Sequence, residues 1–341
     1  MDTILLIPIY EPTEKTITFM NKLSKKKFFT LVIDDGSGQK FQQKFQQIRD
    51  TGATVLDYPV NKGKGYALKY GLSYIQKNYP TYNVVTADGD GQHSVKDIER
   101  MIWQTELLSE KSFLLGVRHF DKQTTPKKSY YGNRATSLMY YLSMGIHLED
   151  TQTGLRGFNS SSLQGLLDID GSRFEYEMNQ LIDLVRDGYS LETIKIETIY
   201  ENNNAHSHFR AIRDSYLVYR PLLLFLLSSL SSFIIDVIIF LILATLFGNN
   251  PIKLLTATVG ARVLSGLFNF QLNRKFIFKD HQRIHKSLPK YILLFCSQLI
   301  LSWLGVILFS TFLKSTLISK LLIDSILFTV SFSIQRRFVF T

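Results

Sequence analysis

The chain has 341 residues, a formal net charge of +10 and one cysteine. The basic residues cluster beside apolar stretches, so the charge reflects membrane topology and excludes nucleic acid as the expected partner. A lone Cys296 excludes an intrachain disulfide, and the amino terminus lacks the basic segment of a signal peptide, so we expect the first half in the cytoplasm.

Up to about residue 208, short apolar runs alternate with mixed segments. Strand-like runs occupy residues 3–9, 28–34, 53–58, 82–87 and 112–117, and helical periodicity is present around 14–26, 64–77 and 95–109. This alternation predicts a mostly parallel sheet covered by helices. In such open sheets ligands bind at the carboxyl ends of the strands.

Polar residues follow three of these strands directly. They are Tyr10 and Glu11 after the first strand, Asp34 to Ser37 after the second, and Asp88 to His93 after the fourth. We therefore expect three strand ends to converge on one polar site.

The segment "TADGDGQH" (86–93) places Asp88 and Asp90 one residue apart, and such carboxylates hold divalent cations through oxygen. An EF-hand loop is the main rival, but its sixth position requires Gly and here is His93, and a strand-like run replaces the entering helix. A solvated Gly-Asp turn also remains open, as does an Asx-rich turn for "VIDDGSG" and a plain helix entry for "NKGKGYALKYG". No G-x-G-x-x-G follows the first strand, which argues against dinucleotide binding.

From residue 221 onward four apolar segments are long enough to cross a bilayer, approximately 221–247, 251–273, 289–313 and 316–335. Lysine and arginine are distributed unequally between their two sides, eleven against three. This asymmetry places both termini in the cytoplasm. The chain thus divides into a soluble domain (1–208), a juxtamembrane segment (209–220) and a membrane domain (221–341).

Two segments of the membrane half align without a gap, "FNFQLNRKFIF" (268–278) and "VSFSIQRRFVF" (330–340). They indicate two duplicated hairpins related by an axis along the membrane normal. Ordinary Phe-rich interfacial anchoring is the alternative.

Asp236 and Arg262 lie at similar depth in the first two spans, each 11 positions from the expected outer end, or roughly 17 Å. Isolated charges at that depth are costly, so we predict that they pair, either as a structural clamp or beside a polar path.

Seven segments resemble one known family: "IPIYEP", "IDDGSG", "NKGKGYALKYG", "TADGDGQH", "GVRHF", "NRATS" and "DTQTGLRGF". Their order and spacing are similar to family 2 glycosyltransferases, specifically polyprenyl-phosphate sugar synthases of the dolichyl-phosphate mannose synthase type. The membrane half resembles GtrA-like proteins. The resemblance implies a GT-A (Rossmann-like) nucleotide-sugar-binding domain followed by an all-α four-helix transmembrane domain.

The resemblance also implies roles for individual residues. Nucleotide-sugar binding falls to Pro8, Tyr10, Glu11, Asp34, Asp35, Lys64, Asp88 and Gly89. Asp88, Asp90 and Gln92 would hold Mg²⁺ or Mn²⁺. Arg118 and Arg134, with Arg210 near the membrane, would position the acceptor phosphate, and Asp90, Arg118 and Arg134 would serve catalysis. Asp150, Thr153, Arg156 and Glu175 would shape the sugar pocket.

We therefore expect a membrane-bound, metal-dependent, inverting glycosyltransferase. It would move a hexose-type sugar from a nucleotide donor, UDP-linked by preference, to polyprenyl (undecaprenyl) phosphate. The reaction would take place at the cytoplasmic face and serve cell-envelope glycan modification. The membrane domain would contact lipid and support a possible homo-oligomer. Two alternatives stay open: a lipid-linked sugar translocase whose soluble half only binds nucleotide sugar, and a processive polysaccharide synthase. The Q-x-x-R-W pattern of the latter is missing around Trp103 and Trp303.

Overall fold

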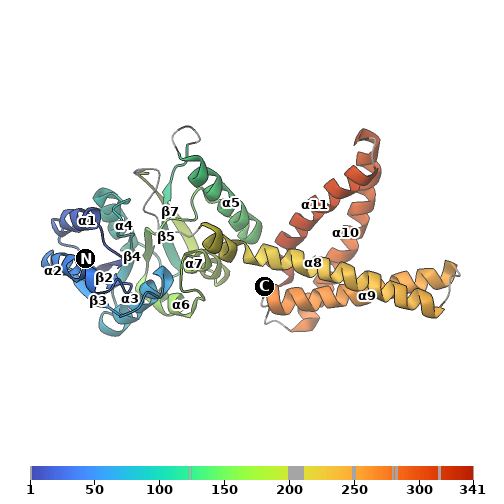
Figure 1. Ribbon diagram of the computed structural model, residues 1–341, viewed down its shortest axis with the longest axis horizontal. Helices are drawn as coiled ribbons and strands as arrows, with labels where there is room; N and C mark the ends of the chain where they lie inside the picture. Colours follow the sequence, from blue (N-terminus) through green and yellow to red (C-terminus); the bar gives the residue numbers. More distant parts are fainter. Residues whose placement is uncertain are drawn as a thin grey trace. The chain divides into compact units, whose positions relative to one another are not determined.

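A computed structural model describes residues 2–121, 123, 125–198, 211–247, 251–278, 280, 283–313 and 316–340. Residues Met1–Tyr140 and Ile146–Val218 form one compact unit, and Tyr141–Gly145 and Tyr219–Thr341 form a second (Figure 1). The first is an α/β unit and the second is helical.

The α/β unit is built on a seven-stranded sheet with the order β3-β2-β1-β4-β6-β5-β7. Its strands are β1 (Thr3–Ile9), β2 (Phe29–Asp34), β3 (Thr54–Asp57), β4 (Asn83–Thr86), β5 (Ser112–Arg118), β6 (Arg156–Phe158) and β7 (Ser190–Ile196). All neighbouring pairs are parallel except those of β6, which runs antiparallel to β4 and β5. The five strands expected from the sequence are confirmed. Strands β6 and β7 were not predicted, because neither contains a continuous run of apolar residues.

The two faces of the sheet follow from the alternation of side chains along β1. Leu5, Ile7 and Ile9 join the buried core formed with helices α1 (Glu14–Ser24), α2 (Gln42–Asp50) and α4 (Val95–Thr105). Leu6 points to the other face, where α3 (Lys64–Asn78) approaches so closely that a Cβ on Gly71 would lie 2.4 Å from Leu6 Cδ1. Both faces are therefore covered, and the apolar runs are buried on each side.

Three further helices complete this unit: α5 (Lys127–Met144), α6 (Leu163–Asp168) and α7 (Glu175–Arg186). Helix α3 packs against α6 and α7. The start of α3 is tied to the start of α7, because the Tyr66 N–H donates to the Ser172 carbonyl at 2.9 Å. This contact matters below because Lys64 is the first residue of α3.

The second unit contains α8 (Ala211–Phe247) from Tyr219 onward, α9 (Pro251–Leu272), α10 (Ile284–Leu313) and α11 (Thr316–Ile334). These four helices coincide with the four expected spans, although α8 and α10 begin earlier. Within the described residues, two stretches are long and apolar enough to cross a bilayer, Leu223–Leu246 and Ile284–Phe309. Many apolar side chains of α8 are exposed in the isolated chain, as for Leu227 and Phe233, which is the pattern of a lipid-facing surface.

The two aligned segments of the membrane half have the same local structure. Each forms a short π-helix at the equivalent place, Asn273–Ile277 and Gln335–Val339. Phe276 and Phe338 are 66% and 62% exposed, whereas Phe270 and Phe332 are buried, as are Phe278 and Phe340. The rings of Phe278 and Phe340 stack with their centres 5.2 Å apart. Equal burial in both copies supports duplication over simple interfacial anchoring. Asn273 donates to Gln335 Oε1 at 2.9 Å, so equivalent residues of the two copies contact each other.

Candidate active site

The carboxyl ends of β1 and β2 are held together by backbone contacts. The Asp35 N–H donates to the Ile9 carbonyl at 2.8 Å, and the Glu11 N–H donates to Ser37 Oγ at 2.9 Å. Glu11 has a φ of 52°, which is uncommon for a residue other than glycine and is often found at functional sites. Pro8 lies within β1 opposite Ile33, so the residues expected to surround the nucleotide begin at this edge.

Asp34 and Asp35 have different surroundings. Asp34 is half-buried and accepts from the Ser37 N–H at 2.8 Å, and burial raises the pKa of its carboxyl above the ordinary value. Asp35 is buried, and its carboxylate accepts from the Tyr58 hydroxyl at 2.6 Å and from the Lys62 N–H at 2.9 Å. Asp35 therefore fastens the segment before α3, and any effect on a nucleotide would act through that segment.

Lys64 lies between two carboxylates from distant parts of the chain. Its Nζ is 2.6 Å from Asp88 Oδ1 and 2.8 Å from Glu177, which is on α7. Burial alone would lower the pKa of Lys64, but the negative charges of Asp88 and Glu177 outweigh it and raise that pKa. Burial alone would raise the pKa of Asp88, but Lys64 and a hydrogen bond with His93 hold it well below its usual range. The three side chains form a partly buried series of alternating charges.

Two further groups contact the Asp88 carboxylate, which keeps 29% of its side chain exposed. His93 Nε2 lies 3.3 Å from Asp88 Oδ2, and the loop before β6 passes directly over the group. A Cβ on Gly154 would lie 2.6 Å from both Asp88 oxygens. Thr86 Oγ1 donates to the Gly154 carbonyl at 2.8 Å and fixes this loop against β4. Only glycine fits at residue 154 without moving the carboxylate.

Asp90 and Gln92 lie in the turn after β4, beside Asp88. Asp90 Oδ1 accepts from the Gln92 N–H at 3.0 Å, and desolvation together with the nearby charge of Asp88 raises the pKa of Asp90. Two carboxylates and an amide are oxygen ligands that suit Mg²⁺ or Mn²⁺. In the part of the chain that the structure describes, no group of three or more His, Cys, Asp or Glu side chains gathers as metal ligands. The Lys64 ammonium contacts Asp88, so this side of the carboxylate accommodates a positive group. The residues therefore fit a divalent cation.

Arg118, the last residue of β5, is held by Asp150. Its Nε and Nη2 donate to the two Asp150 oxygens at 2.7 and 3.2 Å, and the Gln152 N–H donates to Asp150 Oδ1 at 2.9 Å. Asp150 is fully buried, whereas the Arg118 side chain is 19% exposed, so the guanidinium reaches the surface in one fixed orientation. Asp150 thus orients Arg118, while the sequence suggested a place for it in the sugar pocket.

Two further arginines were expected at the acceptor phosphate. Arg134 is exposed on α5, with its guanidinium 5.8 Å from the centre of the Tyr130 ring. Arg210 lies outside the described residues.

The candidates for the sugar pocket are mostly buried. Arg156 has no exposed surface; it donates to the Thr153 carbonyl at 3.0 Å and to the Glu177 carbonyl at 2.5 Å, and burial lowers its pKa. Thr153 is buried as well. Glu175 Oε1 accepts from the Ser172 N–H at 3.1 Å at the start of α7. Arg156 therefore supports Glu177 through its backbone carbonyl, and Glu175 holds the start of α7.

Two site residues were missed by the sequence reasoning, Glu177 and His93. In "FEYEM" the earlier Glu175 was chosen, although Glu177, Gln180, Leu181 and Leu184 share the helical spacing of a buried face. That spacing is the signal that identifies Glu177. His93 was considered only as a mismatch to a calcium loop.

In the helical unit, the two intramembrane charges are close together. Arg262 Nε lies 3.7 Å from Asp236 Oδ2, and Ser265 donates to Asp236 Oδ1 at 2.9 Å. Asp236 is the more buried of the two, with 14% of its side chain exposed against 54% for Arg262.

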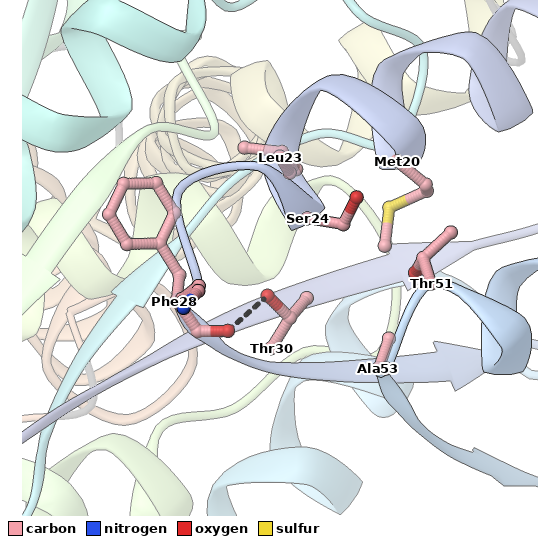
Figure 2. A pocket seen from close by; sticks show the side chains of 9 residues that line it. Met20, Leu23, Ser24, Phe28, Thr30, Thr51 and Ala53 are labelled. Carbon is pink, nitrogen blue, oxygen red and sulfur yellow. Dashed lines mark hydrogen bonds between the residues drawn. The ribbon is translucent and has the colours of Figure 1, made fainter.

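A hollow of about 260 Å³ lies at the opposite edge of the sheet, near the amino ends of β2 and β3. Figure 2 shows Thr30, hydrogen-bonded to the Phe28 carbonyl, together with Met20 and Leu23 in its wall. None of the candidate residues lines it, so it has no connection with the polar site.

Comparison with known proteins gives two family matches. Residues 6–167 match the family described as Glycosyl transferase family 2, and residues 209–340 match the GtrA/DPMS transmembrane domain. An uncharacterized protein of Methanocaldococcus jannaschii is 27% identical over 201 residues, which cover 58% of this chain and 81% of that protein. A UDP-N-acetylglucosamine–dolichyl-phosphate N-acetylglucosaminyltransferase of Methanococcus voltae is 26% identical over 243 residues, covering 64% and 94%.

Similar solved structures include mannosyl-3-phosphoglycerate synthase from Rubrobacter xylanophilus, with 16% identity and a TM-score of 0.48 over 64% of this chain and 71% of the other. A second is the mannosyltransferase PcManGT from Pyrobaculum calidifontis in complex with GDP-Man and Mn²⁺, with 12% identity and a TM-score of 0.42 over 99% and 87%.

Proposed function

We propose that the chain is a family 2 glycosyltransferase fused to a GtrA/DPMS transmembrane domain, as the matches over residues 6–167 and 209–340 support, and that it transfers a hexose-type sugar from a nucleotide donor to a polyprenyl phosphate. A UDP-linked donor and an isoprenoid phosphate acceptor are favoured by the name of the Methanococcus voltae relative. The reaction would take place at the cytoplasmic face, as the distribution of lysine and arginine favours.

One observation carries the proposal: a single loop joins the two charged groups that such a transfer requires. At one end of residues 150–154, Asp150 orients Arg118, and at the other end Gly154 encloses the carboxylate of Asp88. A cation-binding carboxylate and an arginine for phosphate are thereby held by the same short segment. This arrangement suits a donor diphosphate beside Asp88 and a lipid phosphate beside Arg118.

In the proposed reaction an oxygen of the lipid phosphate attacks the anomeric carbon of the donor sugar. The bond from that carbon to the nucleotide diphosphate breaks on the opposite side, so the configuration is inverted. The lipid phosphate is already anionic near neutral pH, and the protein need not remove a proton. Arg118 would hold the phosphate in line with the anomeric carbon, which lowers the entropic part of the barrier.

Asp88, Asp90 and Gln92 would hold Mg²⁺ or Mn²⁺. When bound, the cation would neutralise charge on the departing diphosphate. The strand ends around Glu11 and Asp34 would accept hydrogen bonds from ribose hydroxyls and base N–H groups, and Asp35 would keep the segment before α3 in place.

The test is a donor screen on the full-length protein in detergent, with polyprenyl phosphate, Mg²⁺ or Mn²⁺, and UDP- and GDP-linked sugars. Mass spectrometry of the lipid should show one sugar per polyprenyl phosphate for the wild type and at least a hundredfold less product for Asp90→Ala. Asp187→Ala, an exposed aspartate at the end of α7, is the matched control and should keep full activity.

Three outcomes would contradict the proposal. Unchanged product from Asp90→Ala rejects the metal assignment. Nucleotide-sugar binding without any lipid product favours a translocase with an inactive soluble half. A polymer on the lipid favours a processive synthase.

A further inference from the structure

The inference concerns Lys64 and Glu177 and rests on the proposed function, because it assumes that Asp88 contacts a divalent cation. The Asp88 carboxylate is covered on most sides, although 29% of its side chain is exposed. Oδ1 faces Lys64 Nζ at 2.6 Å, Oδ2 faces His93 at 3.3 Å, and Gly154 covers the group. A cation can therefore take the place beside Oδ1 only if Lys64 withdraws.

Lys64 is the partner suited to withdraw. Gly154 is backbone held by Thr86, and His93 is buried with 2% of its side chain exposed. Lys64 carries a flexible four-carbon stem, and its ammonium already has a second partner, since Nζ lies 2.8 Å from Glu177. Loss of the contact with Asp88 would leave that ammonium paired rather than isolated.

Glu177 is fixed, so it is able to retain the lysine. Its side chain is only 7% exposed, and its backbone carbonyl accepts from the buried Arg156. The backbone of α3 at Lys64 is also fixed, because a Cβ on Gly65 would lie 2.6 Å from Tyr176 Cβ on α7. Both helix starts stay in contact, and only the lysine side chain has to move.

We propose that Lys64 occupies the place of the divalent cation at Asp88, gives up that contact when the cation binds, and is then held by Glu177. Glu177 is thus a positioning residue that sets cation affinity through Lys64, although it does not contact the cation. Binding of the divalent cation then exchanges one positive group at Asp88, the Lys64 ammonium, for another. The Asp88 carboxylate is therefore never left as an unpaired charge.

The proposal predicts opposite effects at the two residues. Lys64→Met removes the competing charge and should tighten Mn²⁺ binding about tenfold. Glu177→Gln removes the second partner of the lysine, leaves the lysine bound to Asp88, and should weaken Mn²⁺ binding about tenfold. A purely structural role predicts that both variants weaken binding, because both would distort the site.

The experiment is a nucleotide-free Mn²⁺ titration of the full-length protein in detergent, in which electron paramagnetic resonance measures free Mn²⁺. Lys77→Met, on the same helix, and Glu192→Gln, on β7, remove the same charges from exposed positions and should change the dissociation constant less than twofold. Lys64→Arg keeps the positive charge and should stay weaker than Lys64→Met. Circular dichroism melts establish that each variant is folded.

The outcomes separate this inference from the proposed function. Tighter binding by Lys64→Met with weaker binding by Glu177→Gln supports the exchange. A second outcome is that the wild type binds Mn²⁺, Asp90→Ala abolishes binding, and Lys64→Met leaves binding unchanged or weaker. This outcome overturns the exchange but keeps the metal assignment. No binding by the folded wild type overturns both.

Discussion

Substitution of Gly154 by alanine tests whether the loop before β6 determines the position of Asp88. The new Cβ would meet both Asp88 oxygens at 2.6 Å, whereas ordinary contact begins at 3.4 Å, so the carboxylate or the loop must move by about 0.8 Å. Asp88 has a short side chain, already fixed by Lys64 and His93, and it cannot turn aside without breaking those contacts. A misplacement of this size at a reacting centre costs on the order of 50-fold in rate.

The assay is the rate of sugar transfer to polyprenyl phosphate at saturating donor, together with the Mn²⁺ dissociation constant of the same preparation. Gly165→Ala on α6 is the control, because its Cβ would meet nothing within 4 Å. We expect Gly165→Ala to match the wild type and Gly154→Ala to lose most of its rate and to bind Mn²⁺ more weakly. Equal rates for the two alanine variants would refute the reasoning that this loop positions Asp88.

Two further predictions concern buried charges. Asp150→Asn weakens the charge-assisted hydrogen bonds to Arg118, which are worth about 1.5–3 kcal/mol. We expect the KM for polyprenyl phosphate to rise about 10- to 100-fold, with little change in the KM for the donor. A rise confined to the KM for the donor would contradict a phosphate role for Arg118. In the membrane domain, Asp236→Arg and Arg262→Asp should each lower assembly or activity, and the double variant should restore it if the 3.7 Å pair is a clamp. The detergent-solubilised yield and the transfer rate measure the rescue. If the single and double variants all insert into the membrane and the double variant is not rescued, the pairing is excluded.

The strand-helix alternation was enough to predict the parallel core of the sheet and the polar residues at its edge. Each of those features depends on local spacing: buried strands are continuous apolar runs, and their carboxyl ends meet at one edge whatever the details of packing. The same holds for the four apolar segments and for the two aligned copies, which share Phe270/Phe332, Arg274/Arg336, Phe276/Phe338 and Phe278/Phe340. Strand β6 escaped prediction because three residues, Arg156, Gly157 and Phe158, carry no strand pattern and pair only because β4 and β5 flank them.

The sequence by itself determined which residue types gather at the carboxyl edge, because the order of strands and motifs along the chain places Asp34, Asp88 and Arg118 at strand ends. Only the tertiary structure decided what those side chains contact. Lys64 and Glu177 are separated by 113 positions along the chain, and Asp35 turned inward to hold the segment before α3. Partners that far apart are chosen by the packing of α3 on α7 and of the 150–154 loop on β4, and no local pattern carries that information.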